Sequence, residues 1–410
     1  MSSTGGSALL TPSRLGRALG LGPGQDIDPR WVKTKQMATL WAGYGSVTEV
    51  TVAAPTAANR AGGIYTGGND GGEPGTMSFT TRRLILKRVS PPPNGRGPSH
   101  DRKLRSYEAE AAFYSCAPDG PAWALLDAWL AVPTPLATAS DKTSCLREFL
   151  LSDLRVTHPR RFRGGSFDEA VAGLTFLAGM HAAFWERPTP AGVWPEGSYW
   201  RLDTRLDELS RTDDVRVVRS ARAIDLRLRG VVSEGADGER KQRRARRTLI
   251  HGDPKGDNLL LSEAGARGET TTAAAYDFQY VGGGLGARDV AYFLTAAVDP
   301  RVLEAHEDAL VAAYHAALLE GLEGREGRPE DAESVDACRA SYPLDALRDD
   351  LELAVADYAR FMAGWGYWGN AEWAEATASR CLDRIDAGKT LDSEEAYVHA
   401  VARAYPFPEY

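Results

Sequence analysis

The sequence has few cysteines, no long apolar run and no excess of positive charge. Its four cysteines stand far apart, at Cys116, Cys145, Cys338 and Cys381. They therefore give neither the paired spacing of a zinc site nor a disulfide framework. This usage favours a reducing compartment, and we expect a cytoplasmic protein. No apolar stretch approaches the roughly 18 residues that a membrane span needs, so we expect no membrane partner.

The net charge of −8 argues against a nucleic-acid partner, because a phosphate backbone repels an acidic surface. With 43% hydrophobic and 25% charged residues, the composition is that of an ordinary globular protein. A chain of 410 residues is too long for one simple core and suits two lobes. We predict no obligate protein partner, and the sequence does not predict an oligomeric state.

The first 25 residues lack acidic groups and carry Arg14 and Arg17. One interpretation is an organelle transit peptide, which is basic and poor in acids. The other, which we favour, is an N-terminal tip and short helix within residues 1–30. Thr11 would then cap this helix and Pro12 would occupy its first position.

Strand patterns separated by glycine dominate the next part of the chain. Ser46–Ala53 alternates β-branched and polar residues, as a half-buried strand does. Residues 54–75 are rich in Gly, Ala, Pro and Asn and predict a long hairpin loop whose role the sequence does not indicate. Met77–Val89 predicts the returning strand, which the prolines at 91–93 terminate.

The later pattern is mainly helical. A helix is predicted from Arg105, a short strand over Cys145–Leu154, and a helix that Ser166 and Glu169 open as a capping box. Apolar residues spaced by three or four predict one more helix over Leu344–Trp365. The predicted fold class is therefore α+β, with a small β-rich N-lobe over residues 31–154 and a larger, mainly helical C-lobe over residues 155–410.

The run His251-Gly-Asp-Pro-Lys-Gly-Asp-Asn258 carries the groups that phosphoryl transfer requires. That reaction needs positioning, metal ions that absorb charge, and a carboxylate near the attacking hydroxyl. Asp253 is the candidate base, and Asn258, five residues later, can coordinate Mg²⁺ through its side-chain oxygen. Lys255 could neutralise charge that develops on the transferred phosphoryl group.

A second metal ligand is predicted one hairpin downstream of this run. Residues 262–272 form a polar turn with glycine, and Ala273–Asp277 predicts the strand that returns beside Asn258. Asp277 would then supply an anionic oxygen ligand to Mg²⁺, which prefers hard oxygen donors.

The nucleotide side needs a strand cation and a helix carboxylate that holds it. Lys87, near the end of its strand, and Glu110, on the next predicted helix, are the candidate pair. Gly43, Gly45 and Ser46 stand just ahead of or at the start of the first strong strand, where their backbone N–H groups could cover phosphates. Lys87 and Glu110 could instead be an exposed strand cation and a helix-surface acid.

Three further features have a functional and a structural interpretation. His251 could act as a base, but we favour a role in bracing the loop, because Asp253 already supplies a base. The Arg-rich segment 240–247 suggests a nucleic-acid patch or a solvated insertion, and nearby acidic residues favour the insertion. Five late tryptophans could form an aromatic cage or pack in the core or a pocket wall, and we favour packing. They are Trp194, Trp200, Trp365, Trp368 and Trp373.

Together these motifs resemble the kinase-like small-molecule phosphotransferases: aminoglycoside phosphotransferases, choline kinases and, most closely, the ecdysteroid-kinase-like group. The resemblance rests on four segments spread over residues 40–367: Glu110–Tyr114, Met180–Trp185, the run at His251, and Asp277–Gln279 followed by Ala287–Leu294.

This resemblance implies a bilobal protein-kinase-like fold, ATP as phosphoryl donor and a small-molecule hydroxyl as acceptor. It implies that Asp289 supports the catalytic loop through hydrogen bonds without taking part in the chemistry. It also implies that adenine meets backbone groups near Leu150–Asp153, with Leu151 and Ser152 at the centre.

Departures from the protein-kinase pattern point away from protein substrates. Gly252 stands where those enzymes have Arg, and Gln279 replaces the last glycine of D-F-G. Only 12 positions (289 − 277) separate Asp277 from Asp289, which leaves no room for a long activation segment. A nucleotide-binding pseudokinase and a protein kinase remain the alternatives. The acceptor stays open among a sterol, an amino alcohol, a sugar and an antibiotic, and we expect its pocket within residues 184–228 and 344–373.

Overall fold

The computed structural model describes residues 7–55, 79–115, 130–141, 143–234, 240–242, 246–263, 270–323 and 342–407. The chain divides into two compact units. The first comprises Met1–Tyr107 and Pro133–Val156, and the second comprises Glu108–Val132 and Thr157–Tyr410. The predicted boundary near residue 154 resembles this division, except that residues 108–132 group with the second unit.

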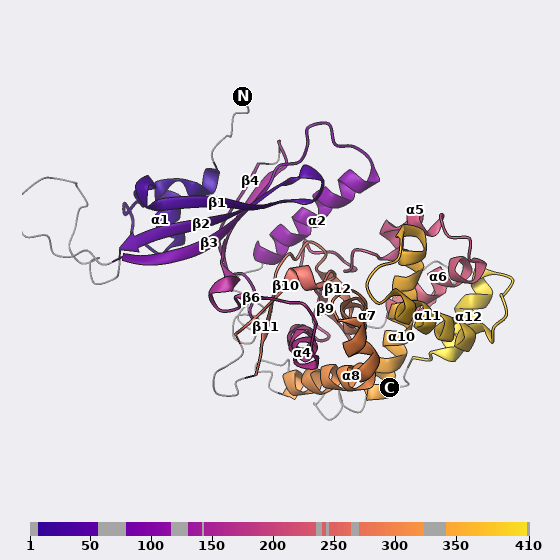
Figure 1. The fold of residues 1–410 in the computed structure, drawn as a ribbon. Helices are drawn as coiled ribbons and strands as arrows, with labels where there is room; N and C mark the ends of the chain where they lie inside the picture. The colour runs from indigo at the N-terminus through magenta and orange to yellow at the C-terminus, as the bar shows by residue number, and fades with distance from the viewer. Residues whose placement is uncertain are drawn as a thin grey trace, which may run out of the picture. The chain divides into compact units, whose positions relative to one another are not determined.

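The first unit is built on a five-stranded antiparallel sheet in the order β1-β2-β3-β5-β4 (Figure 1). The strands are β1 Val32–Thr39, β2 Gly45–Pro55, β3 Phe79–Val89, β4 Pro135–Asp141 and β5 Leu146–Ser152. The predicted strands correspond to β2, β3 and β5. The strands β1 and β4 were not predicted, because their side chains are mostly exposed or half-buried and carry no apolar alternation.

The N-terminal segment packs on one face of this sheet. Its helix α1, Pro12–Ala18, begins with Pro12 at the first position, as predicted, although Thr11 makes no side-chain capping bond. Leu15 and Ile27 are buried against Val50 and Leu84 of the sheet. This segment from residue 7 onward is therefore part of the core of the first unit.

The helix α2 spans Pro98–Ser115 and begins earlier than the predicted start at Arg105, because Pro98 is well suited to an early helical position. The second unit is mainly helical. Its longer helices are α4 Phe167–Ala183, α6 Val215–Leu228, α7 Gly286–Ala296, α8 Pro300–Glu323, α10 Leu344–Trp365, α11 Ala371–Asp386 and α12 Glu394–Ala404. A short helix α5 covers Leu206–Leu209. The predicted α+β fold class, with a small β-rich unit and a larger helical one, is confirmed.

Small sheets in the second unit carry the motif region. The strands are β6 Arg160–Arg161, β7 Val231–Glu234, β8 Arg240–Gln242, β9 Arg247–Ile250, β10 Leu259–Leu261, β11 Ala273–Ala275 and β12 Gly282–Leu285. They pair as β11-β10-β6, β12-β9 and β7-β8. The predicted hairpin before Asp277 is therefore β10 with β11, and the glycine-rich segment after Gln279 forms strand β12.

Two of the predicted segments lie partly outside the described residues. The loop at 54–75 is described only at Ala54 and Pro55, and the Arg-rich segment only at 240–242 and 246–247. Arg246 is buried beside Tyr342, and Arg247 forms an ion pair with Glu196 at 2.6 Å. The end of the Arg-rich segment is thus internal, and the predicted solvated insertion is wrong for these two residues.

None of the helices in the described ranges is long and apolar enough to cross a membrane. The cysteines Cys116 and Cys338 lie outside those ranges, whereas Cys145 is half-buried and Cys381 is fully buried.

The buried thiol of Cys381 gives a first testable prediction. Burial raises its pKa to about 12, despite a hydrogen bond from Tyr405 that lowers it. At pH 8 such a thiol is ionised to about one part in ten thousand. A thiol-reactive disulfide reagent should therefore label Cys145 in the native protein and Cys381 only in denaturant, as peptide mapping by mass spectrometry would show. Equal native labelling of both residues would contradict this packing.

Candidate active site

The loop that contains Asp253 is held between two of the small sheets. It leaves β9 at Ile250 and enters β10 at Leu259 after a short 3-10 turn at Gly256–Asn258. Gly252 adopts a φ of +82°, and a Cβ there would collide with the carbonyl oxygen of Tyr280. Only glycine suits this conformation without strain. The departure from the protein-kinase pattern at this position therefore has a steric reason.

Asp253 is buried, and its two carboxylate oxygens have different surroundings. Oδ2 accepts hydrogen bonds from Asn258 Nδ2 and Lys255 Nζ, each at 3.1 Å. Oδ1 has no hydrogen-bond partner among the described residues. A buried carboxylate oxygen without a hydrogen-bond donor is costly in free energy.

The electrostatic surroundings of Asp253 combine burial with charges of both signs. Burial raises the pKa of Asp253, the charge of Lys255 opposes this, and the charge of Asp277 raises it further. For Lys255, burial alone would lower the pKa, but the carboxylates of Asp253 and Asp277 outweigh it and raise the pKa. Lys255 therefore stays cationic, with its side chain partly exposed beside the two carboxylates.

The two predicted metal ligands flank the paired strands β10 and β11: Asn258 precedes β10, Asp277 follows β11, and the N–H of Tyr276 donates to the carbonyl oxygen of Asn258 at 3.1 Å. The amide nitrogen of Asn258 donates to the carbonyl oxygen of Asp253 at 2.9 Å and to its carboxylate, which leaves the amide oxygen to hold a cation. Asp277 has a left-handed φ of +68°, and its Oδ1 accepts a bond from Gln279 at 2.7 Å. Such backbone strain in a residue other than glycine is often found at functional sites.

This donor set fits a magnesium ion. The negative charge of Asp277 raises the pKa of Asp253, so the two carboxylates destabilise one another without a cation. Carboxylate and amide oxygens are suitable ligands, with water and phosphate to complete the octahedron. In the described ranges no group of three His, Cys, Asp or Glu side chains could hold a metal by itself.

His251 is fully engaged by the backbone around it. Its Nδ1 accepts a hydrogen bond from the N–H of Asp253 at 3.3 Å, and its Nε2 lies 3.1 Å from the carbonyl oxygen of Tyr276. Since an N–H can only donate and a carbonyl can only accept, the ring is the neutral tautomer with hydrogen on Nε2. Neither nitrogen is available to a substrate, which supports the predicted bracing role.

Asp289, at the start of α7, binds the backbone of the loop. Its Oδ2 accepts from His251 N at 2.7 Å and its Oδ1 from Gly252 N at 2.9 Å. His181 on α4 lies 3.2 Å from Oδ2, and Tyr314 lies 2.8 Å from the other nitrogen of His181. No sequence pattern assigns His181 to this network. Its only signal was a histidine on an apolar helix face.

Glu110 and Asp277 both act on the same buried tyrosine of the second unit. Burial, and then the charges of Glu110 and Asp277, raise the pKa of Tyr114, which lies one helical turn after Glu110 on α2. Phe278 is buried between this helix and the loop, stacked on Phe113 with ring centroids 4.1 Å apart and with the His251 ring at 4.7 Å. These contacts explain why residues 108–115 group with the second unit.

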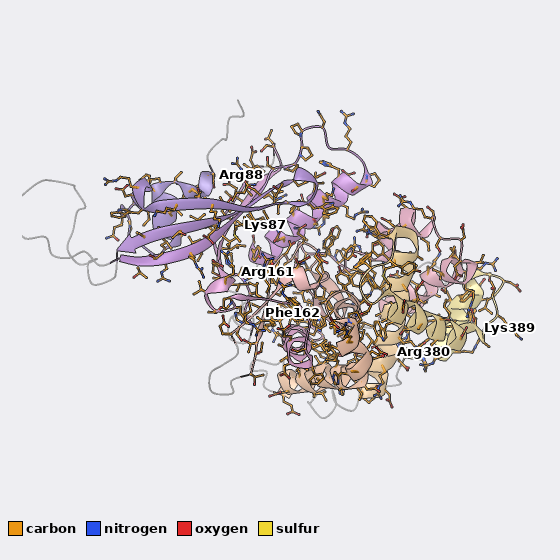
Figure 2. All side chains as sticks on the ribbon, in the orientation of Figure 1. Lys87, Arg88, Arg161, Phe162, Arg380 and Lys389 are labelled. Carbon is orange, nitrogen blue, oxygen red and sulfur yellow. The ribbon has the colours of Figure 1, made fainter. Side chains whose placement is uncertain are left out.

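The remaining predicted nucleotide residues lie in the first unit. Lys87, labelled on β3 in Figure 2, is buried with its Nζ 5.9 Å from the centroid of the Tyr107 ring. The predicted pair of Lys87 with Glu110 joins the two units and stays a prediction. Gly43 ends a 3-10 turn between β1 and β2, and Gly45 and Ser46 pair with Val89 and Arg88 on β3.

Two of these backbone positions are constrained. Gly45 has a φ of +149°, and a Cβ there would collide with the carbonyl oxygen of Arg88. Leu151 and Ser152 end β5, where Ser152 is bound to Thr134 through both its N–H, at 2.9 Å, and its hydroxyl, at 2.8 Å. These two bonds engage the N–H and the hydroxyl of Ser152, and the adenine contact near Leu150–Asp153 stays a prediction.

An aromatic wall faces Asp253 within the second unit. After burial, the charge of Asp253 is the next cause that raises the pKa of Tyr199 and of Tyr292, and it also contributes at Tyr358. Trp200, Trp365 and Trp368 join the same cluster through ring contacts with Tyr358 or Phe361.

The buried side chain of Arg205 places a positive charge against these aromatic rings. The guanidinium of Arg205 lies 5.4 Å from the ring centroid of Tyr199, 5.1 Å from that of Phe361 and 5.5 Å from that of Trp365. Arg205 is buried and forms an ion pair with Glu208 at 3.2 Å. Trp194 is contacted separately by Arg201 at 4.2 Å. This arrangement agrees with packing as the role of Trp200, which is fully buried.

Comparison with known proteins agrees with the motif analysis. A model of the "Ecdysteroid kinase-like family" matches residues 206–325, which include the Asp253 loop, Asp277 and Asp289. The predicted resemblance to the kinase-like small-molecule phosphotransferases is confirmed over this segment of the chain. No protein with a curated description matches the chain.

Three solved structures show distant similarity. An ethanolamine kinase from Plasmodium vivax is 7% identical, with a TM-score of 0.37 over 85% of this chain and 81% of that one. A choline kinase from Streptococcus pneumoniae is 12% identical, with a TM-score of 0.38 over 85% and 94%. An aminoglycoside 2′-phosphotransferase variant with GDP is 11% identical, with a TM-score of 0.38 over 80% and 89%.

Proposed function

We propose that the protein transfers the γ-phosphoryl group of ATP to a hydroxyl of a small molecule, with Mg²⁺ as cofactor. The observation that carries this proposal is the asymmetric environment of Asp253. Its Oδ2 is held by Asn258 and Lys255, whereas its buried Oδ1 has no partner among the described residues. An acceptor hydroxyl that donates to Oδ1 would satisfy this atom and be oriented for attack.

The residues of the loop then have separate roles. Asp253 orients the acceptor hydroxyl and receives its proton, and its raised pKa brings its basicity closer to neutral pH. Lys255, 3.1 Å from Asp253 and partly exposed, stabilises negative charge that develops on the transferred group. His251 and Asp289 hold the loop backbone and take no part in the proton transfer.

Asn258 and Asp277 are the residues that would hold Mg²⁺. When bound, the ion neutralises charge on the β- and γ-phosphates and fixes their position. Lys87 and Glu110 would serve the nucleotide from the strand and helix on which they lie. The turn at Gly43–Ser46 would cover its phosphates with backbone N–H groups.

The acceptor would lie along the aromatic wall that includes Tyr199, Tyr292 and Tyr358. Their hydroxyls are close enough to Asp253 for its charge to raise their pKa values. Because Arg205 already stands over Tyr199, Phe361 and Trp365, a second cation at those rings would meet like charge. We therefore expect the wall to favour an acceptor without a quaternary ammonium group there.

The metal site gives a prediction of its own. Replacing Asp277 with Asn removes an anionic ligand, so the Mg²⁺ concentration for half-maximal turnover should rise on the order of tenfold or more. The matched control is Glu263→Gln, an exposed carboxylate at the end of the same hairpin, which should leave this concentration unchanged. An unchanged Mg²⁺ requirement in Asp277→Asn, measured by titration of the turnover rate, would remove Asp277 from the metal site.

The acceptor can be found by a screen of hydroxyl-bearing metabolites. The protein, Mg²⁺ and ATP are incubated with each compound, and ADP formation and the shift in unfolding temperature are recorded. The proposal expects a hydroxyl compound that raises ADP formation above the background given by Asp253→Asn. Tight Mg-ATP binding with no transfer to any class of acceptor would instead indicate a pseudokinase.

A further inference from the structure

The exposed turn between β1 and β2 holds a buried tyrosine. Trp41 is 79% exposed and Gly43 is exposed as well, whereas Tyr44 is only 5% exposed. One backbone hydrogen bond, from Gly43 N to Leu40 O at 3.0 Å, closes the turn on itself. Another, from Ser90 N to Tyr44 O at 2.6 Å, joins it to the end of β3. The side chain of Tyr44 adds contacts beyond the sheet.

These contacts are made to one face of helix α2. The hydroxyl of Tyr44 forms a hydrogen bond with Nδ1 of His100 at 2.6 Å. Nζ of Lys103 lies 4.7 Å from the centroid of the Tyr44 ring. The ring of Tyr107 stacks on that of Tyr44, with centroids 6.3 Å apart and an angle of 29° between the planes. Residues 100, 103 and 107 follow helical spacing and therefore share one face of α2.

The same face of α2 lies beside the cation that we assign to the nucleotide. Nζ of Lys87 is 5.9 Å from the centroid of the Tyr107 ring, and Glu110 follows Tyr107 by one helical turn. In the sheet, Lys87 pairs with Val47, three residues after Tyr44. Tyr107 is thus a neighbour of both Tyr44 and Lys87, so the turn and the cation are positioned against the same helix.

The hydrogen bond between Tyr44 and His100 is well defined. A Cβ at Gly95 would collide with the imidazole of His100, so this ring lies directly against the backbone there. Burial and then the charge of Asp101 raise the pKa of Tyr44, which keeps its hydroxyl protonated. Because a hydroxyl can donate or accept, the bond persists in both protonation states of His100. Tyr44 is therefore held at its hydroxyl as well as at the face of its ring.

We propose that Tyr44 is a positioning residue for nucleotide binding, which holds the turn at Gly43–Ser46 against α2 and so places its backbone for the phosphates. This role rests on the proposed function in one respect, because the turn is assigned to the nucleotide there. Tyr44 need not touch the nucleotide, since it acts through the backbone on either side of it. A turn that is already fixed loses less conformational entropy on binding, and this strengthens binding.

Calorimetric titration of Mg-ATP into the full-length protein tests this role. Tyr44→Ala removes both the hydroxyl and the ring, and should raise the Kd for Mg-ATP about tenfold. Adenosine, which has no phosphate, should bind equally to the wild type and to Tyr44→Ala in ligand-observed NMR. This selective loss is the signature of a residue that acts through the turn over the phosphates.

Two conservative variants isolate the hydrogen bond. Tyr44→Phe keeps the ring and removes the hydroxyl, whereas His100→Phe keeps a ring and removes the nitrogen. Each should raise the Kd for Mg-ATP about threefold, and the double variant should bind no more weakly than either one, because all three lack the same bond. Additive losses in the double variant would overturn the role of this bond.

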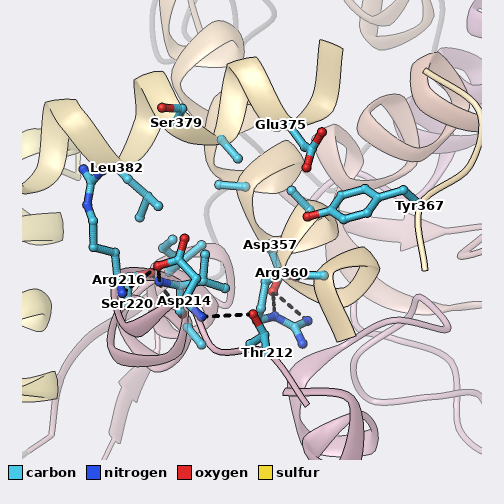
Figure 3. A pocket seen from close by; sticks show the side chains of 17 residues that line it. Thr212, Asp214, Arg216, Ser220, Asp357, Arg360, Tyr367, Glu375, Ser379 and Leu382 are labelled. Carbon is cyan, nitrogen blue, oxygen red and sulfur yellow. Dashed lines mark hydrogen bonds and ion pairs between the residues drawn. The ribbon is translucent and has the colours of Figure 1, made fainter. Parts of the chain in front are cut away.

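Two destabilising variants serve as controls. Val52→Ala leaves a cavity in the core of the first unit, at the end of β2 away from the turn. Leu382→Ala enlarges a pocket of about 320 Å³ between α6, α10 and α11 of the second unit (Figure 3). Both should lower the urea midpoint, because each leaves empty space in a packed region. Neither touches the turn, so both should keep the wild-type affinity for Mg-ATP.

The possible results distinguish the role of Tyr44 from the proposed function. A wild-type protein that binds no Mg-ATP would overturn both. Wild-type affinity in Tyr44→Ala, or equal losses for Mg-ATP and adenosine, would overturn the role of Tyr44 alone. So would a loss in Tyr44→Ala no larger than that in Val52→Ala. If Tyr44→Ala does not fold, an unchanged Kd in both Tyr44→Phe and His100→Phe overturns this role.

Discussion

Replacing Asp253 with Asn is expected to lower kcat by about 10²- to 10⁴-fold, the range associated with loss of a general base. The amide cannot receive the acceptor's proton, although it is nearly the same size as the carboxylate and can keep the contacts of the loop. Affinity for Mg-ATP should change little, because Asn258 and Asp277 remain. Kinetics with the acceptor from the screen and calorimetric titration of Mg-ATP would separate the two effects.

The matched control is Asp257→Asn in the same loop. Asp257 is exposed. The hydroxyl of Tyr276 donates a hydrogen bond to its backbone oxygen, which the substitution leaves in place. This variant should keep close to wild-type kcat. Equal losses in the two variants would mean that charge in the loop, rather than a base at position 253, supports the reaction.

Removing the carboxylate of Asp289 is expected to give the largest loss of stability. In Asp289→Ala the N–H groups of His251 and Gly252 lose their acceptor inside the core, and His181 loses one of its two partners. Breaking a buried charged network of this kind costs about 3–5 kcal/mol. Urea unfolding should therefore show a much lower midpoint, and turnover should fall because the Asp253 loop is no longer fixed.

Two further variants make this prediction specific. Asp289→Asn keeps one acceptor oxygen and should lose less stability than Asp289→Ala. The control is Asp308→Ala on α8. The side chain of Asp308 is 90% exposed, so its removal should leave the urea midpoint unchanged. A midpoint of Asp289→Ala that equals the midpoint of this control would contradict the assigned role of Asp289.

The sequence was most informative where local chemistry fixes the conformation. The alternation in β2, the apolar period of α10 and the serine cap of α4 each follow from neighbouring residues. The strand β1 was not predicted. It is stabilised by antiparallel pairing with β2, and the composition of β1 gives no sign of this partner.

The candidate site likewise combines features that neighbouring residues predict with features that depend on distant parts of the chain. The spacing from Asp253 to Asn258 is a local pattern and could be read directly. The network of His181, Asp289 and Tyr314 joins α4 to α7 and α8, and Asp289 and Tyr314 lie 108 and 133 positions after His181, so no local spacing could indicate it. The burial of Arg246 beside Tyr342 and Asp350 was missed for the same reason, since a run of arginines in isolation suggests a solvated surface.

Identification of the reaction product tests the central claim most directly. Incubation with Mg²⁺, ATP and the acceptor from the screen would be followed by phosphorus NMR, with Asp253→Asn in parallel. We predict that ADP and a new phosphomonoester of the acceptor appear in equal amounts with the wild type and are almost absent with Asp253→Asn. A phosphomonoester formed at the wild-type rate by Asp253→Asn would contradict the account.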